Sequence, residues 1–291
     1  VHPPGNPRPC PPGEQGCHPP RITRPVVLVF AGSHGVTCQG VSAYPPAVTE
    51  QMVRNFEVGG AAINQICRVV VAELEVINLA QVPTHDFTTG PAMDEPECVA
   101  AMAKGMEAVT AGTDLLAIGE MGIGNTTPSS AITAVVTGAD PSVTTGRGTG
   151  LDDRALAHKV EVVRRSIEVN KPDSEDGLDL LAKVGGFEIG MLAGAMLGTA
   201  AAHRPAVVDG FISGAAALIA WTLAPTLSHY LIASHQSVEP GHRIAMETMG
   251  LTPLLDMGMR LGEGSGATLA MPIIEAAAKC LAEMATFADA G

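Results

Sequence analysis

The stretch Leu115-Leu-Ala-Ile-Gly-Glu-Met-Gly-Ile-Gly-Asn-Thr-Thr127 decides the fold. It begins with four apolar residues, which are typical of a buried strand. Three glycines follow, and then Asn125 and Thr126, residue types that are favoured where helices start. The order predicts a strand, a glycine loop and a helix N-terminus. Glycine lets such a loop approach a ligand closely, and the free N–H groups of a helix start favour a phosphate.

Glu120 lies in the same loop. A carboxylate beside a bound anion is not expected to contact the phosphate itself. It is expected to face a cationic or proton-bearing part of the ligand. Taken alone, the loop leaves an ordinary turn after a strand as an equal alternative, so the rest of the chain has to decide between them.

Composition excludes several classes of function. The chain has 291 residues, of which 46% are hydrophobic, which is enough for one large domain with an appendage or for two domains. The net charge of −13 and the 3% content of aromatic residues argue against a nucleic-acid surface. The six cysteines show no CxxC pair and suggest a reducing cytoplasm. Cys10, Cys17 and His18 have poor spacing for a metal site, so no metal is expected.

Two apolar stretches, 190–202 and 211–225, test a membrane interpretation. Each is shorter than the roughly 20 residues that a spanning helix needs. Their alanine and glycine content favours helices that pack closely on a sheet. The start of the sequence lacks the basic and apolar regions of a signal peptide. We therefore expect no membrane span and a cytoplasmic location.

Strand and helix patterns alternate along the chain, which predicts an α/β fold with a mainly parallel, Rossmann-like sheet flanked by helices. The predicted strands are 25–30, 74–79, 115–118, 205–208 and 230–233. The predicted helices are 47–56, 61–71, 95–112, 129–137, 155–169, 178–184, 188–202, 215–223, 243–249 and 268–287. Residues 1–25 are rich in proline and are expected to form an extended arm.

Four further turns contain glycine, and they carry His34, Arg147, Asp209 and Glu263. Since ligands bind beyond the carboxyl ends of parallel strands, these side chains and Glu120 are expected to gather at one edge of the sheet. The pattern predicts a small-molecule site with an anion cradle and several carboxylates. An ordinary turn histidine at position 34 and a solvated arginine at position 147 remain open alternatives.

Six motifs in this order resemble the nicotinate-nucleotide:dimethylbenzimidazole phosphoribosyltransferase family, from about Pro25 to the C-terminus. They are Gly119-Glu-Met-Gly-Ile-Gly-Asn-Thr-Thr127, Gly146-Arg-Gly-Thr-Gly-Leu-Asp-Asp153, Val184-Gly-Gly-Phe-Glu-Ile189, Asp209-Gly-Phe-Ile-Ser213, Glu239-Pro-Gly-His242 and Leu261-Gly-Glu-Gly-Ser-Gly-Ala267. The resemblance implies transfer of phosphoribose from nicotinate mononucleotide to 5,6-dimethylbenzimidazole, with inversion at the anomeric carbon. The products are α-ribazole 5′-phosphate, the lower-ligand nucleotide of cobalamin, and nicotinate.

The resemblance also implies a homodimer that needs no metal or other cofactor. It implies a Rossmann-like domain with a small helical domain made from both chain ends. In this sequence the division is expected as a Pro-rich arm at 1–24, an α/β catalytic domain at 25–267 and a C-terminal helix of the small domain at 268–291.

Residue roles follow from the same resemblance. Glu263 would be the general base that takes the benzimidazole proton, and Glu120 would orient the base or stabilise developing charge. The nucleotide and its phosphate would be bound by Gly122, Ile123, Gly124, Asn125, Thr126, Gly146, Arg147, Gly148 and Lys159. The acceptor-base pocket would draw on Tyr44, Met52 and Met121.

Two features depart from the family pattern. Members usually have Asp before the His-Gly-Val that starts here at His34, whereas this chain has Ser33. They also have several helices before the first strand, where this sequence has its Pro-rich arm. Two alternatives to the implied reaction are transfer to a different base and a catalytically inactive nucleotide-binding paralogue. Glu120 and Glu263 argue against the paralogue, because a pure binding protein has no need of a base between two glycines.

Overall fold

A parallel sheet forms the centre of the computed structural model, which describes residues 20–289. Its strands lie in the order β2-β1-β3-β4-β5, and each neighbouring pair is parallel. Their bounds are β1 (Pro25–Ser33), β2 (Glu73–Pro83), β3 (Leu115–Met121), β4 (Ala206–Val208) and β5 (Leu231–Ala233). The predicted α/β class with a mainly parallel sheet is confirmed.

The chain passes from β1 to β2 on one side and then crosses to β3 on the other side of β1. This change of direction makes the carboxyl ends of β1 and β3 the topological switch point of the sheet. Ligands of open α/β sheets bind at such a point, because the loops that leave the two strands diverge there. The fold therefore places the glycine loop after β3 where a small-molecule site is expected.

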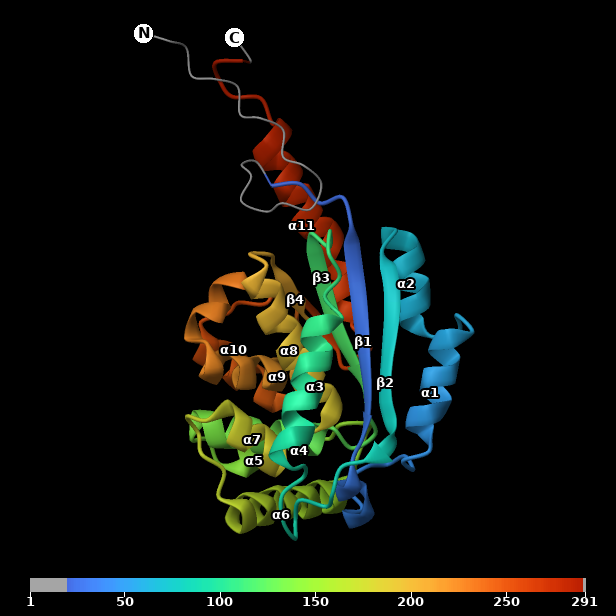
Figure 1. Ribbon diagram of the computed structural model, residues 1–291, viewed down its shortest axis with the longest axis vertical. Coiled ribbons are helices and arrows are strands. Elements are labelled where there is room, and N and C mark those ends of the chain that lie inside the picture. The colour runs from blue at the N-terminus through green and yellow to red at the C-terminus, as the bar shows by residue number, and fades with distance from the viewer. Residues whose placement is uncertain (1–19, 290–291) are drawn as a thin grey trace.

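Helices cover both faces of the sheet (Figure 1). Their bounds are α1 (Val48–Glu57), α2 (Ala62–Val70), α3 (Glu95–Glu107), α4 (Thr126–Thr137), α5 (Pro141–Thr144), α6 (Asp153–Asn170), α7 (Gly177–Val184), α8 (Phe187–Ala201), α9 (Phe211–Leu223), α10 (Pro240–Met249) and α11 (Ser265–Glu283). The helices α1, α2 and α11 pack on one face, and α8 and α9 pack on the other. Short 3₁₀ helices span Gly35–Gln39 and Pro225–Tyr230.

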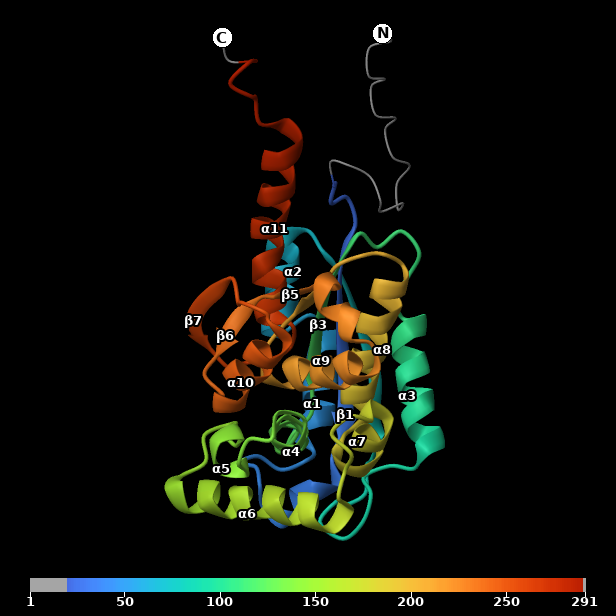
Figure 2. The ribbon, with the colours of Figure 1, turned by 90° about the vertical axis from the view of Figure 1, so that its left-hand side faces the viewer.

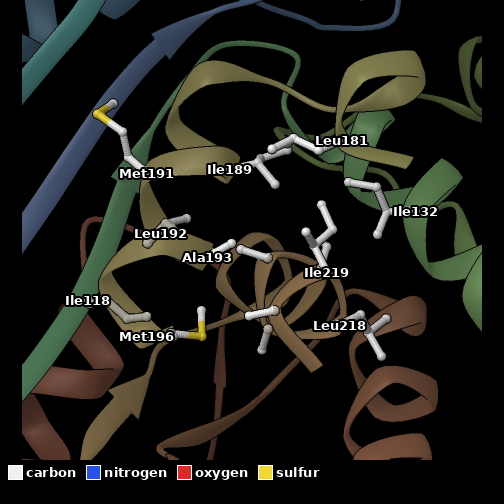
Figure 3. Close-up of a cluster of buried hydrophobic side chains, with 14 of the residues drawn as sticks. Ile118, Ile132, Leu181, Ile189, Met191, Leu192, Ala193, Met196, Leu218 and Ile219 are labelled. Carbon is white, nitrogen blue, oxygen red and sulfur yellow. The ribbon is translucent and has the colours of Figure 1, made fainter. Parts of the chain in front are cut away.

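Alternating side chains of the central strands build two separate apolar layers. Leu28 and Phe30 pack toward α8 and α9, whereas Val27 and Val29 pack toward α2 and α11. This is the two-residue period of a strand that is buried on both faces. Ile118 of β3 joins the larger layer with the apolar side chains of α8 and α9 (Figure 3).

Glycines bring α3 and α8 into close contact in this larger layer. A Cβ on Gly105 would lie 1.9 Å from the carbonyl oxygen of Met191, and one on Gly194 would lie 2.0 Å from that of Met102. The small residues in 190–202 therefore serve helix packing, as expected. Among the described residues, no helix combines the length and the apolarity needed to cross a bilayer.

Several boundaries differ from those expected. The helix α9 begins at Phe211 and α10 at Pro240, both in segments predicted as turns. Residues predicted as a loop include β6 (His235–Ser237), which pairs in parallel with β7 (Leu255–Met259). β6 has three residues, which are too few for a periodic pattern. β7, Leu-Asp-Met-Gly-Met, does alternate, but no strand was predicted there.

The helix α11 extends away from the body of the molecule, beside residues 20–24 (Figure 2). It begins at Ser265 and ends at Glu283, whereas a helix over 268–287 was predicted. Residues 1–19 and 290–291 lie outside the described residues, so most of the predicted arm cannot be compared. The division into a catalytic domain and a small helical domain stays a prediction.

Candidate active site

A pocket of about 570 Å³ opens at the carboxyl ends of β1 and β3. Eleven of the predicted site residues line it: Tyr44, Met52, Glu120, Met121, Gly122, Ile123, Gly124, Asn125, Thr126, Gly148 and Glu263. Sequence reasoning missed several other lining residues: Gly210, Phe211, His235, Ser237, Glu239 and Arg260. The switch point thus gathers three carboxyl groups, a glycine loop and apolar side chains around one cavity.

One end of the pocket is suited to an anion. The glycine loop leads into α4, whose N-terminus at Thr126 carries positive partial charge. Gly124 has φ 90°, and a Cβ there would lie 2.6 Å from Cγ2 of Thr37, so only glycine fits. The fully buried Lys159 of α6 donates to Oγ1 of Thr126 at 2.6 Å and to the carbonyl of Gly146 at 3.3 Å. A helix start and an ammonium group therefore meet at one point.

Burial lowers the pKa of Lys159 to about 8, and the nearby carboxylate of Glu239 acts in the opposite direction. The lysine is consequently still charged at neutral pH, although it is removed from water. Glu239 also accepts the N–H of Gly148 at 2.9 Å. The predicted second glycine loop is thus held at two points: Lys159 binds the carbonyl of Gly146, and Glu239 binds the N–H of Gly148.

Glu263 also lines the pocket and is only 4% exposed. Its Oε2 accepts the N–H of Ile63 at 3.2 Å, in the first turn of α2. Burial raises the pKa of Glu263, while this hydrogen bond lowers it by favouring the charged form. One carboxylate oxygen is thus anchored, and the other remains available to a ligand proton.

Glu120 has a different environment. It accepts a hydrogen bond from the side-chain amide of Asn125. Burial, followed by the charges of Glu188 and Asp209, raises the pKa of Glu120 to about 8. Glu120 therefore carries a proton at neutral pH and can donate a hydrogen bond. Two carboxyl groups whose environments differ in this way can divide the roles of acid and base between them.

The raised pKa of Glu120 gives a prediction for stability. Between the usual glutamate pKa and about 8, the folded protein holds a proton that the unfolded chain has lost, so stability falls as pH rises. Glu120→Gln removes this contribution, which is about 1.4 kcal/mol for each tenfold difference in proton affinity between the folded and unfolded states. We expect the variant to lose less unfolding free energy than the wild type between pH 5 and pH 8, measured by denaturant titration. If the wild type and Glu120→Gln lose the same unfolding free energy over this pH range, the raised pKa of Glu120 is contradicted. Glu247→Gln, which changes an exposed glutamate, is the control.

One part of the pocket lining is apolar. Met52 and Met121 are half-buried, and Val41 and Val48 line the cavity beside them. Tyr44 lies at the mouth, where it is 53% exposed. Apart from Met121, these residues come from the single segment 41–52. These side chains provide an apolar wall suited to a ring, and Ser42 adds a hydroxyl group within the same segment.

Known proteins resemble this chain over nearly its whole length. The DBI_PRT family model, described as Phosphoribosyltransferase, matches residues 13–291. A nicotinate-nucleotide–dimethylbenzimidazole phosphoribosyltransferase of Roseiflexus sp. (strain RS-1) is 52% identical, over 96% of this chain and 85% of that protein. The chain belongs to this phosphoribosyltransferase family. An enzyme of the same name from Desulforamulus reducens is also 52% identical, over 94% of this chain and 84% of that protein.

A solved structure supports the family at the level of the fold. CobT from Thermus thermophilus superposes with a TM-score of 0.90 at 43% identity, and the match covers 95% of this chain and 89% of that one. The resemblance inferred from six motifs is thereby confirmed. The roles of individual residues in this family member still rest on the geometry of its own pocket.

Arg147 does not enter the pocket of this phosphoribosyltransferase family member. Its guanidinium donates to the carbonyl of Leu151 at 2.8 Å and pairs with Asp153, and its side chain is 48% exposed. The structure therefore does not support the predicted phosphate contact. Arg260 lies at the rim instead and donates to the carbonyl of Gly148 at 3.4 Å. No signal in the sequence distinguished the two arginines, because the direction of a side chain depends on packing.

His34 lies behind the pocket wall and does not line the pocket. Its Nε2 is 2.6 Å from Oε1 of Glu188, and both side chains are fully buried. A Cβ on Gly122 would lie 2.9 Å from the same Glu188 oxygen, which places the pair directly behind the glycine loop. Ser33, which replaces the usual Asp, donates to the carbonyl of Ala80 in β2 at 2.7 Å. The His34–Glu188 pair thus supports the glycine loop from outside the cavity, whereas Ser33 ties β1 to β2.

Proposed function

We propose that this family member transfers the 5-phosphoribosyl group of nicotinate mononucleotide to 5,6-dimethylbenzimidazole, forming α-ribazole 5′-phosphate and nicotinate. One observation carries the proposal: a single pocket combines the glycine loop at the start of α4 with three carboxyl groups and an apolar wall. The buried Lys159 does not line the pocket but lies directly behind Thr126, which does. The family membership of the chain supports the same reaction. The phosphate would lie against the glycine loop and the start of α4, with Lys159 behind Thr126, and the acceptor ring would lie against Met52 and Met121.

The reaction balances without a cofactor. One benzimidazole nitrogen attacks C1′ of the ribose while Glu263 takes the proton from the other nitrogen. The bond between C1′ and the nicotinate nitrogen breaks, and its electron pair returns to the ring, which changes from a pyridinium to a neutral pyridine. The leaving group therefore needs no proton. Attack from the face opposite the leaving group inverts the configuration at C1′.

Glu263 fits the role of base because Ile63 holds one carboxylate oxygen and leaves the other free. Glu120, protonated at neutral pH, would donate a hydrogen bond toward the reacting groups or help to orient the acceptor. Most of the remaining rate enhancement would come from holding the two substrates in line, because no further proton has to move.

A direct product assay tests the proposal. The purified protein is mixed with nicotinate mononucleotide and 5,6-dimethylbenzimidazole, and α-ribazole 5′-phosphate is measured by chromatography. We expect product, and a parallel reaction with a purine or a phenol as acceptor measures the preference for the base. Product only from another acceptor would favour transfer to a different base. Nucleotide binding without product from any acceptor would favour the inactive paralogue.

The assembly and location of the protein stay predictions. A homodimer is expected, and light scattering of the purified protein would measure its mass. A cytoplasmic location and the absence of nucleic-acid binding are likewise expected from the composition of the chain.

A further inference from the structure

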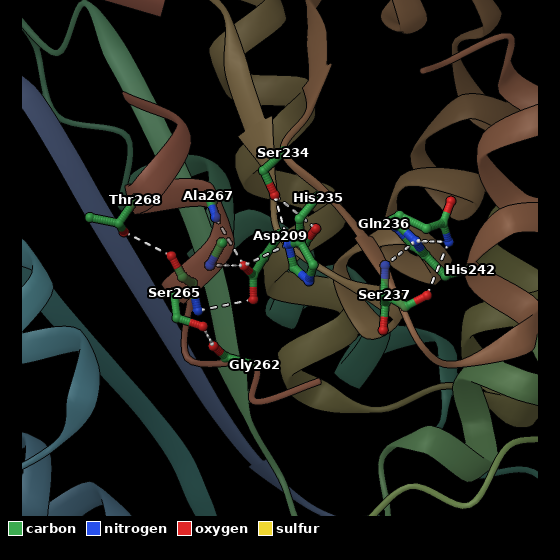
Figure 4. Close-up of polar contacts among 12 residues, drawn as sticks. Asp209, Ser234, His235, Gln236, Ser237, His242, Gly262, Ser265, Ala267 and Thr268 are labelled. Atoms are coloured by element: carbon green, nitrogen blue, oxygen red, sulfur yellow. Dashed lines mark hydrogen bonds and ion pairs between the residues drawn. The ribbon is translucent and has the colours of Figure 1, made fainter. Parts of the chain in front are cut away.

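Asp209 is a buried carboxylate that the mechanism above does not use. It follows β4 directly and is 1% exposed, but it does not line the pocket. Its Oδ1 accepts the N–H groups of Gly266 at 2.7 Å and Ala267 at 3.0 Å, and its Oδ2 accepts that of Gly264 at 3.2 Å (Figure 4). Its direct hydrogen bonds to the pocket region thus go to the segment that carries Glu263, while its charge also raises the pKa of Glu120 and its Oδ1 lies 3.8 Å from Nδ1 of His235.

That loop has an unfavourable backbone conformation at Glu263. The residue has φ 62°, a left-handed value that glutamate rarely adopts, and the glycines on either side of it also have positive φ. A non-glycine residue in this region costs about 1–3 kcal/mol and persists only where the surroundings enforce it. The loop thus needs restraints that outweigh its tendency to relax.

The restraints act on both peptide groups next to the Cα of Glu263. Its own N–H donates to the carbonyl of Glu120 at 3.1 Å, and the next N–H, that of Gly264, donates to Asp209. Gly119 lets the loop approach β3, because a Cβ there would lie 2.0 Å from the nitrogen of Gly264. The direction of the Glu263 side chain is consequently fixed by one bond on each side.

We propose that Asp209 is a positioning residue for proton transfer, which holds the Gly262–Ala267 loop so that the Glu263 carboxylate faces the acceptor base. The inference rests on the proposed function of Glu263. A general base must lie within hydrogen-bond reach of its proton, and a displacement of about 1 Å can cost about 100-fold in rate. The competing explanation is that Asp209 only caps α11, whose N-cap residue Gly264 has no side chain to do so.

Asp209→Asn separates the two explanations. The amide oxygen of asparagine can still accept from Gly266 and Ala267, which preserves the helix cap. The amide nitrogen then replaces Oδ2 and faces the N–H of Gly264, so the hydrogen bond next to Glu263 is lost. The variant also removes the charge that raises the pKa of Glu120, and the exchange measurement described below separates the loss of the bond from this change of charge. We expect kcat to fall by about 10- to 100-fold, with the KM for nicotinate mononucleotide within about twofold of wild type. The phosphate site is held by α4 and Lys159 and is not disturbed.

Asp176→Asn is the matched control. Asp176 caps α7 by accepting the N–H groups of Leu178 at 3.0 Å and Asp179 at 3.1 Å, and α7 contributes no residue to the pocket. We expect this variant to lose thermal stability without a change in kcat. Unchanged kcat in Asp209→Asn would overturn the proposal. The proposal would also be overturned if kcat fell in proportion to the loss of thermal stability, and by the same proportion in Asp209→Asn and Asp176→Asn.

A second measurement does not depend on turnover. Amide hydrogen exchange at residues 262–265 should be faster in Asp209→Asn than in wild type, while exchange in the middle of α11 stays unchanged. Unchanged exchange at 262–265 would overturn the positioning role. If the wild type makes no product, the proposed function fails, and the exchange result alone then decides whether Asp209 holds the loop.

Discussion

Glu263→Gln is expected to lower kcat by about 10²- to 10⁴-fold, the usual contribution of a general base. Glutamine keeps the size of the side chain, and its oxygen can still accept the N–H of Ile63. It cannot take the benzimidazole proton. Because the phosphate is held elsewhere, the affinity for nicotinate mononucleotide should not change. Steady-state kinetics and calorimetric titration of the nucleotide measure both quantities.

The pH profile gives an independent test of Glu263. Burial raises the pKa of this carboxyl group, and the base works only when it is ionised. In the wild type, kcat/KM should therefore fall as the pH drops through a value above the usual glutamate range. This acidic limb should be absent from Glu263→Gln. Glu275→Gln on the exposed side of α11 is the control, and near-normal turnover in Glu263→Gln would contradict the role.

Lys159→Ala is expected to weaken nicotinate mononucleotide binding by about 10- to 100-fold. A hydrogen bond to a charged group contributes about 1.5–3 kcal/mol, and about 1.4 kcal/mol corresponds to tenfold in affinity. The pKa of Lys159 is about 8, so the affinity of the wild type should fall as the pH rises above that value. The affinity of the variant should lose this dependence on pH. Calorimetric titration at pH 7 and pH 9 measures both effects.

Removal of a buried cation can also disturb folding, because Glu239 then lacks its neighbouring charge. Lys159→Met fills the same space without the charge and separates the two effects. It should bind the nucleotide as weakly as Lys159→Ala even when its thermal stability is higher. Lys279→Ala, which changes an exposed lysine on α11, is the control. A dissociation constant equal to that of wild type in Lys159→Met would remove Lys159 from the phosphate site.

The sequence predicted those parts of the fold that depend on local pattern. The strands at Pro25 and Leu115 are continuous apolar runs, and their burial on both faces follows from that composition. The start of α9 at Phe211 was missed, because Asp209-Gly210 has the composition of a turn and the helix follows at once. The pairing of β6 with β7 depends on segments far apart in the chain, which no local pattern contains.

The sequence predicted the positions of those side chains that lie next to glycines or at the ends of strands. Glu263 lies in a turn, and Glu120, which was expected in the glycine loop, is the second-last residue of β3; the structure brings both into one pocket. The partners of Asp209 lie 55–58 residues away in the chain, so its contacts could not be read from its own motif. Arg147 was predicted to contact the phosphate because of its charge. Its ion pair with Asp153 depends on the conformation of the turn between them, which the sequence does not reveal.

The apolar wall and the reacting carboxyl groups come from different parts of the chain. Val41, Tyr44 and Met52 belong to one continuous segment before β2, whereas Glu120 lies at the end of β3 and Glu263 follows β7. Substitutions in segment 41–52 can therefore alter which ring fits without moving the groups that handle its proton. In evolutionary terms, such a lineage can change its acceptor base by mutating one short segment while selection keeps the catalytic loops constant.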